Sequence, residues 1–115
     1  MPSATRRRRV TAEDRLDGVF AALSDRTRRG ILRRLARGPA TVGDLARPLD
    51  MSLPAVSRHL KVMERAGLIG RTIDGRIHRC RLDAGALRIV DRWLDDYRQF
   101  WDEALESLAR YVEES

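Results

Sequence analysis

Apolar residues recur at intervals of three and four along most of the chain, which is the spacing of amphipathic helices. A first helix is predicted over residues 13–23, and its apolar positions are Leu16, Val19, Phe20 and Leu23. A second helix is predicted from a cap at Ser24 or Asp25 to the Gly38-Pro39 pair that ends it. The ordered part of the chain is therefore expected to begin with two short helices.

Two further helices are marked by their caps. Thr41 and Asp44 form a variant of the capping box, so a short helix is expected to start there. Ser52 caps the next helix, and Pro54 suits its first turn because an N–H at that position would have no helical partner. Gly67 supplies a left-handed stop, so this fourth helix is about 14 residues long.

The pattern changes to that of a β-hairpin over residues 68–82. Apolar Ile69, Ile73, Ile77 and Leu82 surround an Asp74-Gly75 dipeptide, which is a strong signal for a tight hairpin turn. Two short antiparallel strands joined by a type I′ turn are predicted. A ribbon of this size is barely stable alone in water, so its base must pack against the helices.

The last predicted helix, over about residues 84–112, has a wider apolar surface than a single domain needs. Apolar residues follow a heptad-like stripe at positions 87, 90, 94, 97, 101, 105, 108 and 112. A second band contains Trp93, Phe100, Ala104 and Tyr111. The simplest partner for the surplus is the same helix of a second copy, although the aromatic residues could instead close a flat monomeric core or line a small-molecule pocket.

The order of elements is four helices, a hairpin and a long helix, and a short helix, a tight turn and a longer capped helix before a basic hairpin are typical of a winged helix-turn-helix. We therefore predict a mainly α fold with a small β wing, formed by residues 13–115 as one domain. Residues 1–12 are expected to be a basic tail. Its run Arg6 to Arg9 either contacts DNA or is simply solvated.

Charge is distributed unevenly, and this favours a polyanionic partner. The formal net charge is +6, but residues 1–82 contain 19 Lys and Arg against 8 Asp and Glu, whereas residues 83–115 contain 4 against 9. A local basic field of this kind recruits nucleic acid. The first two thirds of the chain are thus expected to face double-stranded DNA.

The predicted fourth helix, residues 53–66, has the surface that a major-groove helix requires. Val56, Leu60 and Met63 are spaced to face the core, which turns a basic and polar set outward. Arg can fork onto guanine, Lys can neutralise phosphate, and Ser or His can bond to base edges. The residues expected to contact DNA from this helix are Ser52, Pro54, Ser57, Arg58, His59 on the flank, Lys61 and Arg65. The plain alternative is a solvated basic face.

The hairpin is expected to contribute arginines on both of its faces. Arg71 and Arg76 would project on one face, and Arg79 and Arg81 on the other. Core packing explains such a ribbon poorly, whereas a wing lying along a groove or the DNA backbone explains it well.

Two segments of the chain, LSDRTRRGILRRL (residues 23–35) and LARPLDMSLPAVSRHLKVMERAGLIGRTIDGRIHRCRL (residues 45–82), together with the long closing helix, resemble the ArsR/SmtB-type repressors. The resemblance spans about residues 14–112. It implies a homodimer built from the first and last helices, with recognition helices in successive major grooves and DNA contacts from Ser57, Arg58, His59, Lys61, Arg71, Arg76 and Arg79. The residues then expected at the dimer interface are Leu16, Val19, Phe20, Val90, Trp93, Leu94, Tyr97, Phe100, Trp101, Leu105 and Leu108.

The sequence departs from that family at the positions used for sensing. Arg26 stands where the family commonly has Pro. Thr41 to Asp44 stand where metal sensors often have a Cys-x-Cys pair, and the last helix contains no histidine. A site made from Cys80, His78 and His59 would suit zinc chemically but is not expected to converge, so no metal and no cofactor are predicted. An effector, if one exists, stays unidentified, with a small molecule or Cys80 oxidation as the alternatives.

Other classes of protein fit less well. No set of residues has the spacing of a catalytic triad, paired carboxylates or a nucleotide loop, so an enzyme is not expected. A winged helix that binds protein instead of DNA is the main alternative function. No apolar run is long enough for a membrane span, and no secretory signal is visible, so a cytoplasmic transcriptional regulator, more plausibly a repressor than an activator, is predicted.

Overall fold

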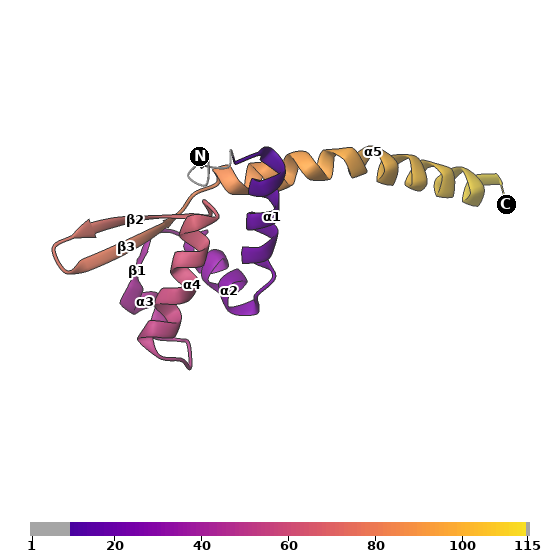
Figure 1. Ribbon diagram of the computed structural model, residues 1–115. Helices are drawn as coiled ribbons and strands as arrows, with labels where there is room; N and C mark the ends of the chain where they lie inside the picture. The colour runs from indigo at the N-terminus through magenta and orange to yellow at the C-terminus, as the bar shows by residue number, and fades with distance from the viewer. Residues whose placement is uncertain (1–9, 115) are drawn as a thin grey trace, which may run out of the picture.

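The structure is a computed structural model that describes residues 10–114. It contains the predicted four helices, hairpin and long closing helix, plus one short strand (Figure 1). The elements are α1 (Ala12–Leu23), α2 (Arg26–Leu35), β1 (Ala40–Thr41), α3 (Val42–Ala46), α4 (Leu53–Arg65), β2 (Ile69–Asp74), β3 (Ile77–Leu82) and α5 (Gly85–Glu114). This is the predicted mainly α fold with a β wing.

Capping residues set where the helices begin. The Asp25 carboxylate caps α2, and Thr41 and Asp44 form the predicted capping box of α3. A second capping box was not predicted: the Thr11 hydroxyl accepts from the Asp14 N–H, and the Asp14 carboxylate accepts from the Thr11 N–H, both at 3.1 Å. Thr11 thus caps α1 and Ala12 is its first residue, so the predicted tail of residues 1–12 extends two residues too far. Its Arg6 to Arg9 run lies outside the described residues.

A three-stranded antiparallel sheet with the order β1-β3-β2 forms the wing and its base. Asp74 pairs with Ile77, so Gly75 and Arg76 form the two-residue turn. Gly75 has φ +61°, and no described residue other than glycine has a positive φ. A type I′ turn needs positive φ at both central residues, whereas type II′ needs it only at the first. The predicted type I′ turn is therefore wrong, and the geometry is that of type II′.

The hydrophobic core lies between α1, α2, α4 and the base of the sheet. Its most buried members are Val19, Val56, Leu60, Met63, Leu68 and Cys80. From α5, only Ala86 is fully buried, with Leu87 and Val90 packed at the edge. Val19 is fully buried in this core, so it cannot supply the predicted dimer surface, whereas Leu16, at 8% exposure, lies outside the core cluster and its place at the interface stays a prediction.

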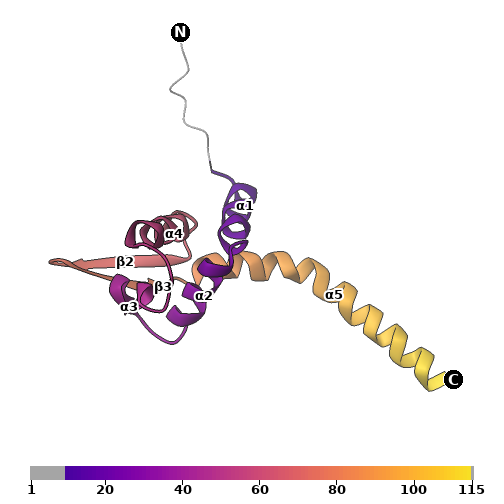
Figure 2. The same ribbon diagram turned by 90° about the horizontal axis from the view of Figure 1, so that it is seen from below.

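Helix α5 leaves the core beside α1 and extends away from it, on the side opposite the wing (Figures 1 and 2). Phe20 of α1 meets Trp93 edge to face, with ring centroids 5.1 Å apart, and Trp93 lies 4.8 Å from Tyr97. Every residue from 91 to 114 is exposed. Among residues 10–114, no helix combines the length and apolar character needed to cross a membrane.

Candidate nucleic-acid interface

Helix α4 is held at both ends by the residues that the sequence marked. The Ser52 hydroxyl accepts from the Ala55 N–H at 3.3 Å, and Pro54 lies in the first turn. Gly67 has φ +79°, and the N–H of Leu68 donates to the Met63 carbonyl at 2.9 Å, which closes the last turn. Fixed caps give the outward side chains of α4 a defined position.

The outward surface of α4 is basic. Val56, Leu60 and Met63 are buried, while Ser52, Pro54, Arg58, Lys61 and Arg65 are exposed and Ser57 is half-buried. Arg58, Lys61 and Arg65 make no ion pair with another described residue, so their charges stay available to a partner. This row can offer a bidentate guanidinium and a flexible ammonium to DNA.

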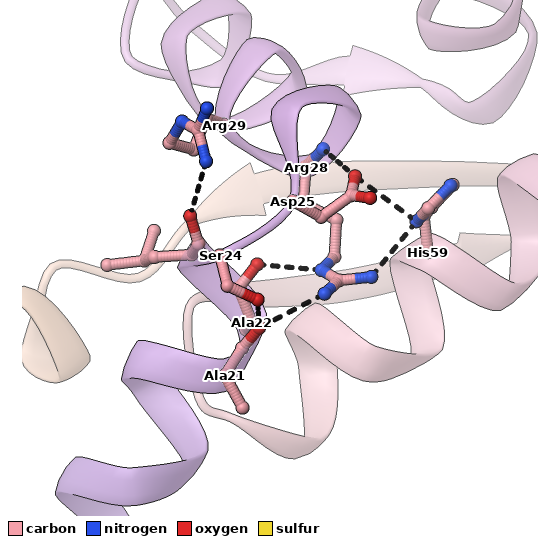
Figure 3. A network of polar contacts seen from close by, with 8 residues as sticks. Ala21, Ala22, Ser24, Asp25, Arg28, Arg29 and His59 are labelled. Carbon is pink, nitrogen blue, oxygen red and sulfur yellow. Dashed lines mark hydrogen bonds and ion pairs between the residues drawn. The ribbon is translucent and has the colours of Figure 1, made fainter.

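His59 lies on the flank of α4 and belongs to a polar network with α1 and α2 (Figure 3). The Arg28 guanidinium lies 3.2 Å from Nδ1 of His59 and donates to the carbonyls of Ala22 at 2.7 Å and Ala21 at 3.1 Å. These carbonyls are in the last turn of α1, and the Ala21 carbonyl also accepts from the Ser24 hydroxyl at 2.6 Å. Arg28 thus joins α1, α2 and the recognition helix.

Asp25 completes this network. Its carboxylate accepts from the Arg28 N–H at 3.0 Å and lies 3.8 Å from Nδ1 of His59. The hydrogen bond from the Arg28 N–H is the main reason that the pKa of Asp25 is lowered, with the charge of the Arg28 guanidinium acting in the same direction. Asp25 is therefore held as a carboxylate at the start of α2.

Arg71 does not point outward from the wing. It pairs with buried Cys80 across the strands, so its side chain turns toward the core, where it is 16% exposed. There its Nη2 lies 2.5 Å from the Glu64 carboxylate of α4, and its Nη1 lies 3.2 Å from Nδ1 of His78. In this structure Arg71 joins the wing to the recognition helix and is not on the surface predicted for DNA contact.

The other wing arginines are exposed. Arg76 lies in the turn, and Arg79 and Arg81 lie on the outer face of β3. Arg81 lies over Gly70, where a side chain would clash with its guanidinium, and donates to the Thr72 hydroxyl at 3.2 Å. Arg76, Arg79 and Arg81 have no described carboxylate partner, so all three carry free positive charge on the wing.

Comparisons with known proteins agree with this geometry. A family profile described as a helix-turn-helix domain matches residues 23–70. The HTH-type transcriptional regulator Rv2034 of Mycobacterium tuberculosis is 42% identical over 97 residues, which are 84% of this chain and 88% of that protein. The crystal structure of an ArsR family transcriptional regulator, RHA00566, has a TM-score of 0.73 at 41% identity and covers 76% of this chain and 97% of its own. The chain belongs to the ArsR family of transcriptional regulators.

Another curated relative has a more specific name. The transcriptional repressor SdpR of Bacillus subtilis is 34% identical to this ArsR-family protein over 79 residues, which are 69% of this chain and 88% of SdpR. The predicted resemblance to ArsR/SmtB-type regulators is thus confirmed, and so is a DNA-binding transcriptional regulator with a winged helix-turn-helix.

Cys80 of this ArsR-family protein lies in the core beneath the wing. Its side chain is fully buried, and burial is the main reason that the pKa of its thiol is raised, which disfavours the reactive thiolate. Among residues 10–114, no cluster of three or more His, Cys, Asp or Glu side chains is placed to hold a metal ion. The surroundings of Cys80 are those of a packed core residue.

The positive surface of the regulator extends beyond the helix-turn-helix. A pocket of about 550 Å³ lies between the start of α1, the end of α4 and the start of α5. Its lining includes the exposed arginines Arg15, Arg65, Arg88 and Arg92, none of which is ion-paired within residues 10–114. The basic potential of α4 therefore continues to the base of α5.

Sequence reasoning missed Arg28 and misplaced Arg71. Nothing in the local pattern could link Arg28 to His59, because they are 31 positions apart and meet only through packing of α2 on α4. A signal for Arg71 did exist, because it lies two positions after apolar Ile69 on the same strand, and side chains two apart on a strand point to the same face. Arg58, Arg65, Arg76, Arg79 and Arg81 are exposed as expected, whereas Arg71 was placed on the surface because of its charge.

Proposed function

We propose that this regulator binds an inverted-repeat operator as a homodimer and represses transcription, acting in the cytoplasm. The observation that carries the proposal is the exposed row of Arg58, Lys61 and Arg65 on α4, which has no carboxylate partner among the described residues. In a winged helix-turn-helix such a helix enters the major groove. Repression is favoured by relatives named as repressors, SdpR and the arsenical resistance operon repressor of Escherichia coli.

Within the proposed interface, some side chains would contact bases and others would contact phosphates. Arg58 would read a base edge, most simply O6 and N7 of guanine, because its guanidinium is a rigid bidentate donor. Lys61 and Arg65 would neutralise phosphates, with Ser52, Ser57 and Pro54 at the same surface. Arg76 and Arg79 would hold the wing on the adjacent groove or backbone.

A second copy of this chain is the proposed partner of α5. Trp93, Leu94 and Tyr97 are 37 to 48% exposed, although all three lie close to the core. Farther along, Phe100, Trp101, Leu105, Leu108 and Tyr111 are 57 to 72% exposed on a part of the helix that no other described residue covers. Contiguous apolar surface of this kind marks an interface, and a two-fold dimer presents each α5 with an identical surface. Phe20 and Val90 lie at its inner edge.

Selection of duplexes from a random pool tests the proposal. The wild-type protein should recover an inverted repeat whose half-sites are about one helical turn apart. Arg58→Ala should then lose about 1 to 3 kcal/mol of discrimination at one base pair, whereas Lys61→Ala should weaken all duplexes alike and reduce the salt slope by about one unit. Arg110→Ala, at the far end of α5, is the matched control. Equal affinity of the wild type for every duplex would contradict a specific operator.

A further inference from the structure

The Arg28 contact decides which nitrogen of His59 carries the proton. A guanidinium has five N–H donors and no acceptor, so an Arg28–His59 hydrogen bond requires Nδ1 to be the acceptor. The observed separation of 3.2 Å is within hydrogen-bond distance. In a neutral imidazole whose Nδ1 accepts, the proton is on Nε2.

Arg28 is itself held in place, so this orientation is not a chance encounter of two mobile side chains. Its Nε donates to the Ala22 carbonyl at 2.7 Å and its Nη2 to the Ala21 carbonyl at 3.1 Å. Two of the three guanidinium nitrogens are thus fixed on α1, and the third is left facing His59. The end of α1 therefore determines where the donor to His59 lies.

Among the described residues, the opposite tautomer would have to donate to Asp25. Asp25 could accept from a protonated Nδ1, but the two atoms are 3.8 Å apart, beyond hydrogen-bond distance. The Asp25 carboxylate is already bonded to the Arg28 N–H at 3.0 Å. A proton on Nδ1 would also face the Arg28 guanidinium directly. The distance to Asp25 and the facing guanidinium of Arg28 both favour the tautomer with the proton on Nε2.

We propose that Arg28 fixes His59 as the Nε2–H tautomer, so that α4 presents this N–H to the operator and His59 reads only a hydrogen-bond acceptor. His59 is 22% exposed, and Figure 3 shows its second nitrogen turned away from Arg28. No described residue bonds to Nε2. The inference rests on the proposed operator binding for its DNA partner, but the tautomer itself is a property of the free protein.

The acceptor requirement restricts what His59 can recognise. In the major groove, N7 of either purine, O6 of guanine and O4 of thymine are acceptors, whereas N4 of cytosine and N6 of adenine are donors. A phosphate oxygen is also an acceptor. His59 therefore favours one of these oxygen or nitrogen acceptors and disfavours an amino group at the atom that it faces.

Nitrogen-15 NMR of the free protein, at a pH where both rings are neutral, tests the first step. We expect the His59 proton on Nε2, and a proton on Nδ1 would overturn the proposal. His78 is an internal comparison, because its Nδ1 lies 3.2 Å from Arg71 and the same argument gives it the same tautomer. In Arg28→Met, His59 should become a mixture of tautomers while His78 is unchanged. An unchanged His59 in a folded Arg28→Met protein would also contradict the proposal.

Two substitutions of His59 test the reading of DNA. The amide nitrogen of His59→Gln can take the place of Nε2–H, whereas His59→Met fills similar space without a donor. We expect His59→Gln to bind the selected operator within about twofold of wild type and His59→Met to bind it about 3- to 10-fold more weakly, the value of one hydrogen bond. The loss in His59→Met should disappear on the duplex that lacks the contacted acceptor. A 7-deazapurine removes N7, 2-aminopurine removes O6 of guanine, 5-methyl-2-pyrimidinone removes O4 of thymine, and a methylphosphonate removes a phosphate oxygen. These duplexes distinguish a base from a phosphate acceptor, and a loss that persists on all of them would overturn the proposed contact.

Operator binding and the His59 tautomer are tested separately. If the wild type selects no operator, the proposed function fails, and the NMR result alone decides the tautomer. If it selects one and both His59 variants bind it as the wild type does, operator binding stands and the role of His59 is overturned. Melting temperatures of all variants separate a lost contact from a lost fold.

Discussion

The guanidinium of Arg71 lies 2.5 Å from the carboxylate of Glu64, which ties strand β2 of the wing to the recognition helix α4. Arg71 also contacts His78 on the neighbouring strand. A two-stranded ribbon has little stability of its own. The charged pair therefore adds to the buried packing of Leu68, Ile69 and Cys80 in fixing the wing against the recognition helix.

Substitution of Arg71 should destabilise the fold, and substitution of Arg79 should not. In Arg71→Ala, the 35% exposed Glu64 loses its partner and the packing of the Arg71 side chain is lost, and we expect the free energy of unfolding to fall by about 1 kcal/mol. Arg79→Ala, on the exposed outer face of β3, should change it by less than about 0.5 kcal/mol. Urea denaturation of both proteins measures the difference. Equal effects would mean that the Glu64 contact contributes nothing.

For DNA binding, measured where both variants are folded, we expect Arg79→Ala to have an effect and Arg71→Ala to have none. Arg79→Ala should lower the dependence of affinity on salt by about one phosphate contact. Arg71→Ala should leave that slope unchanged, because its charge does not face outward. A lower slope in Arg71→Ala would show that the wing rearranges on DNA and releases Arg71.

Acid should weaken the start of α2 through Asp25. Because the pKa of Asp25 is lowered in the folded protein, its contribution is present above the unfolded value of about 3.9 and is lost as the pH falls through the lower, folded value. Asn can also cap a helix but has no charge to lose. Asp25→Asn should therefore flatten the acid side of the stability curve below about pH 4 with little change at pH 7, as measured by thermal melts across pH. Asp17→Asn, inside α1, is the control. An acid limb as steep as that of the wild type would contradict the prediction.

Cys80 should resist alkylation while the protein is folded. The thiol is fully buried and its pKa is raised, so an alkylating agent such as iodoacetamide should modify it only as fast as the core opens. Mass spectrometry over time, with the protein in denaturant as the fully reactive reference, gives the rate. Rapid modification of native protein with loss of DNA binding would instead identify Cys80 as a redox switch.

Polar substitution in the outer half of α5 should separate the proposed dimer. Leu105 and Leu108 are 57% and 58% exposed, so the double variant L105Q/L108Q removes apolar surface without opening the core. Sedimentation should show monomer at concentrations where the wild type is a dimer, and operator affinity should fall about 100-fold as the two half-sites become independent. Glu106→Gln, on the other side of α5, should leave the mass unchanged. A dimer with undiminished affinity in the double variant would exclude this surface.

Local signals in the sequence predicted the helices and the hairpin well. The Thr41–Asp44 capping box, Ser52 before Pro54, and Gly67 act over three or four residues, and the structure confirms each of them. The turn type was wrong because register decides it: pairing of Asp74 with Ile77 moves the loop to Gly75-Arg76. Register depends on how the ribbon packs, which the Asp-Gly dipeptide does not encode.

The features that the sequence did not predict arise from contacts between distant segments. Strand β1 is only Ala40 and Thr41, and it exists because Ala40 pairs with Cys80, 40 positions later. The exposed row on α4 follows from helical periodicity alone, so it was predictable. The Arg71 side chain points inward and Arg28 contacts His59 because of tertiary packing. Net charge gave no indication of either contact.

The narrow attachment of α5 has a mechanical consequence. This 30-residue helix is about 45 Å long and is held to the DNA-binding part mainly at its first turns and at the Phe20–Trp93 contact. A rotation of roughly 10° at that joint displaces the far end of the helix by about 8 Å, a sizeable part of one DNA turn. In a dimer built on α5, the joint acts as a hinge on a lever. Side chains far from DNA, at Phe20 and Trp93, would then set the spacing between half-sites and leave the reading of each half-site unchanged.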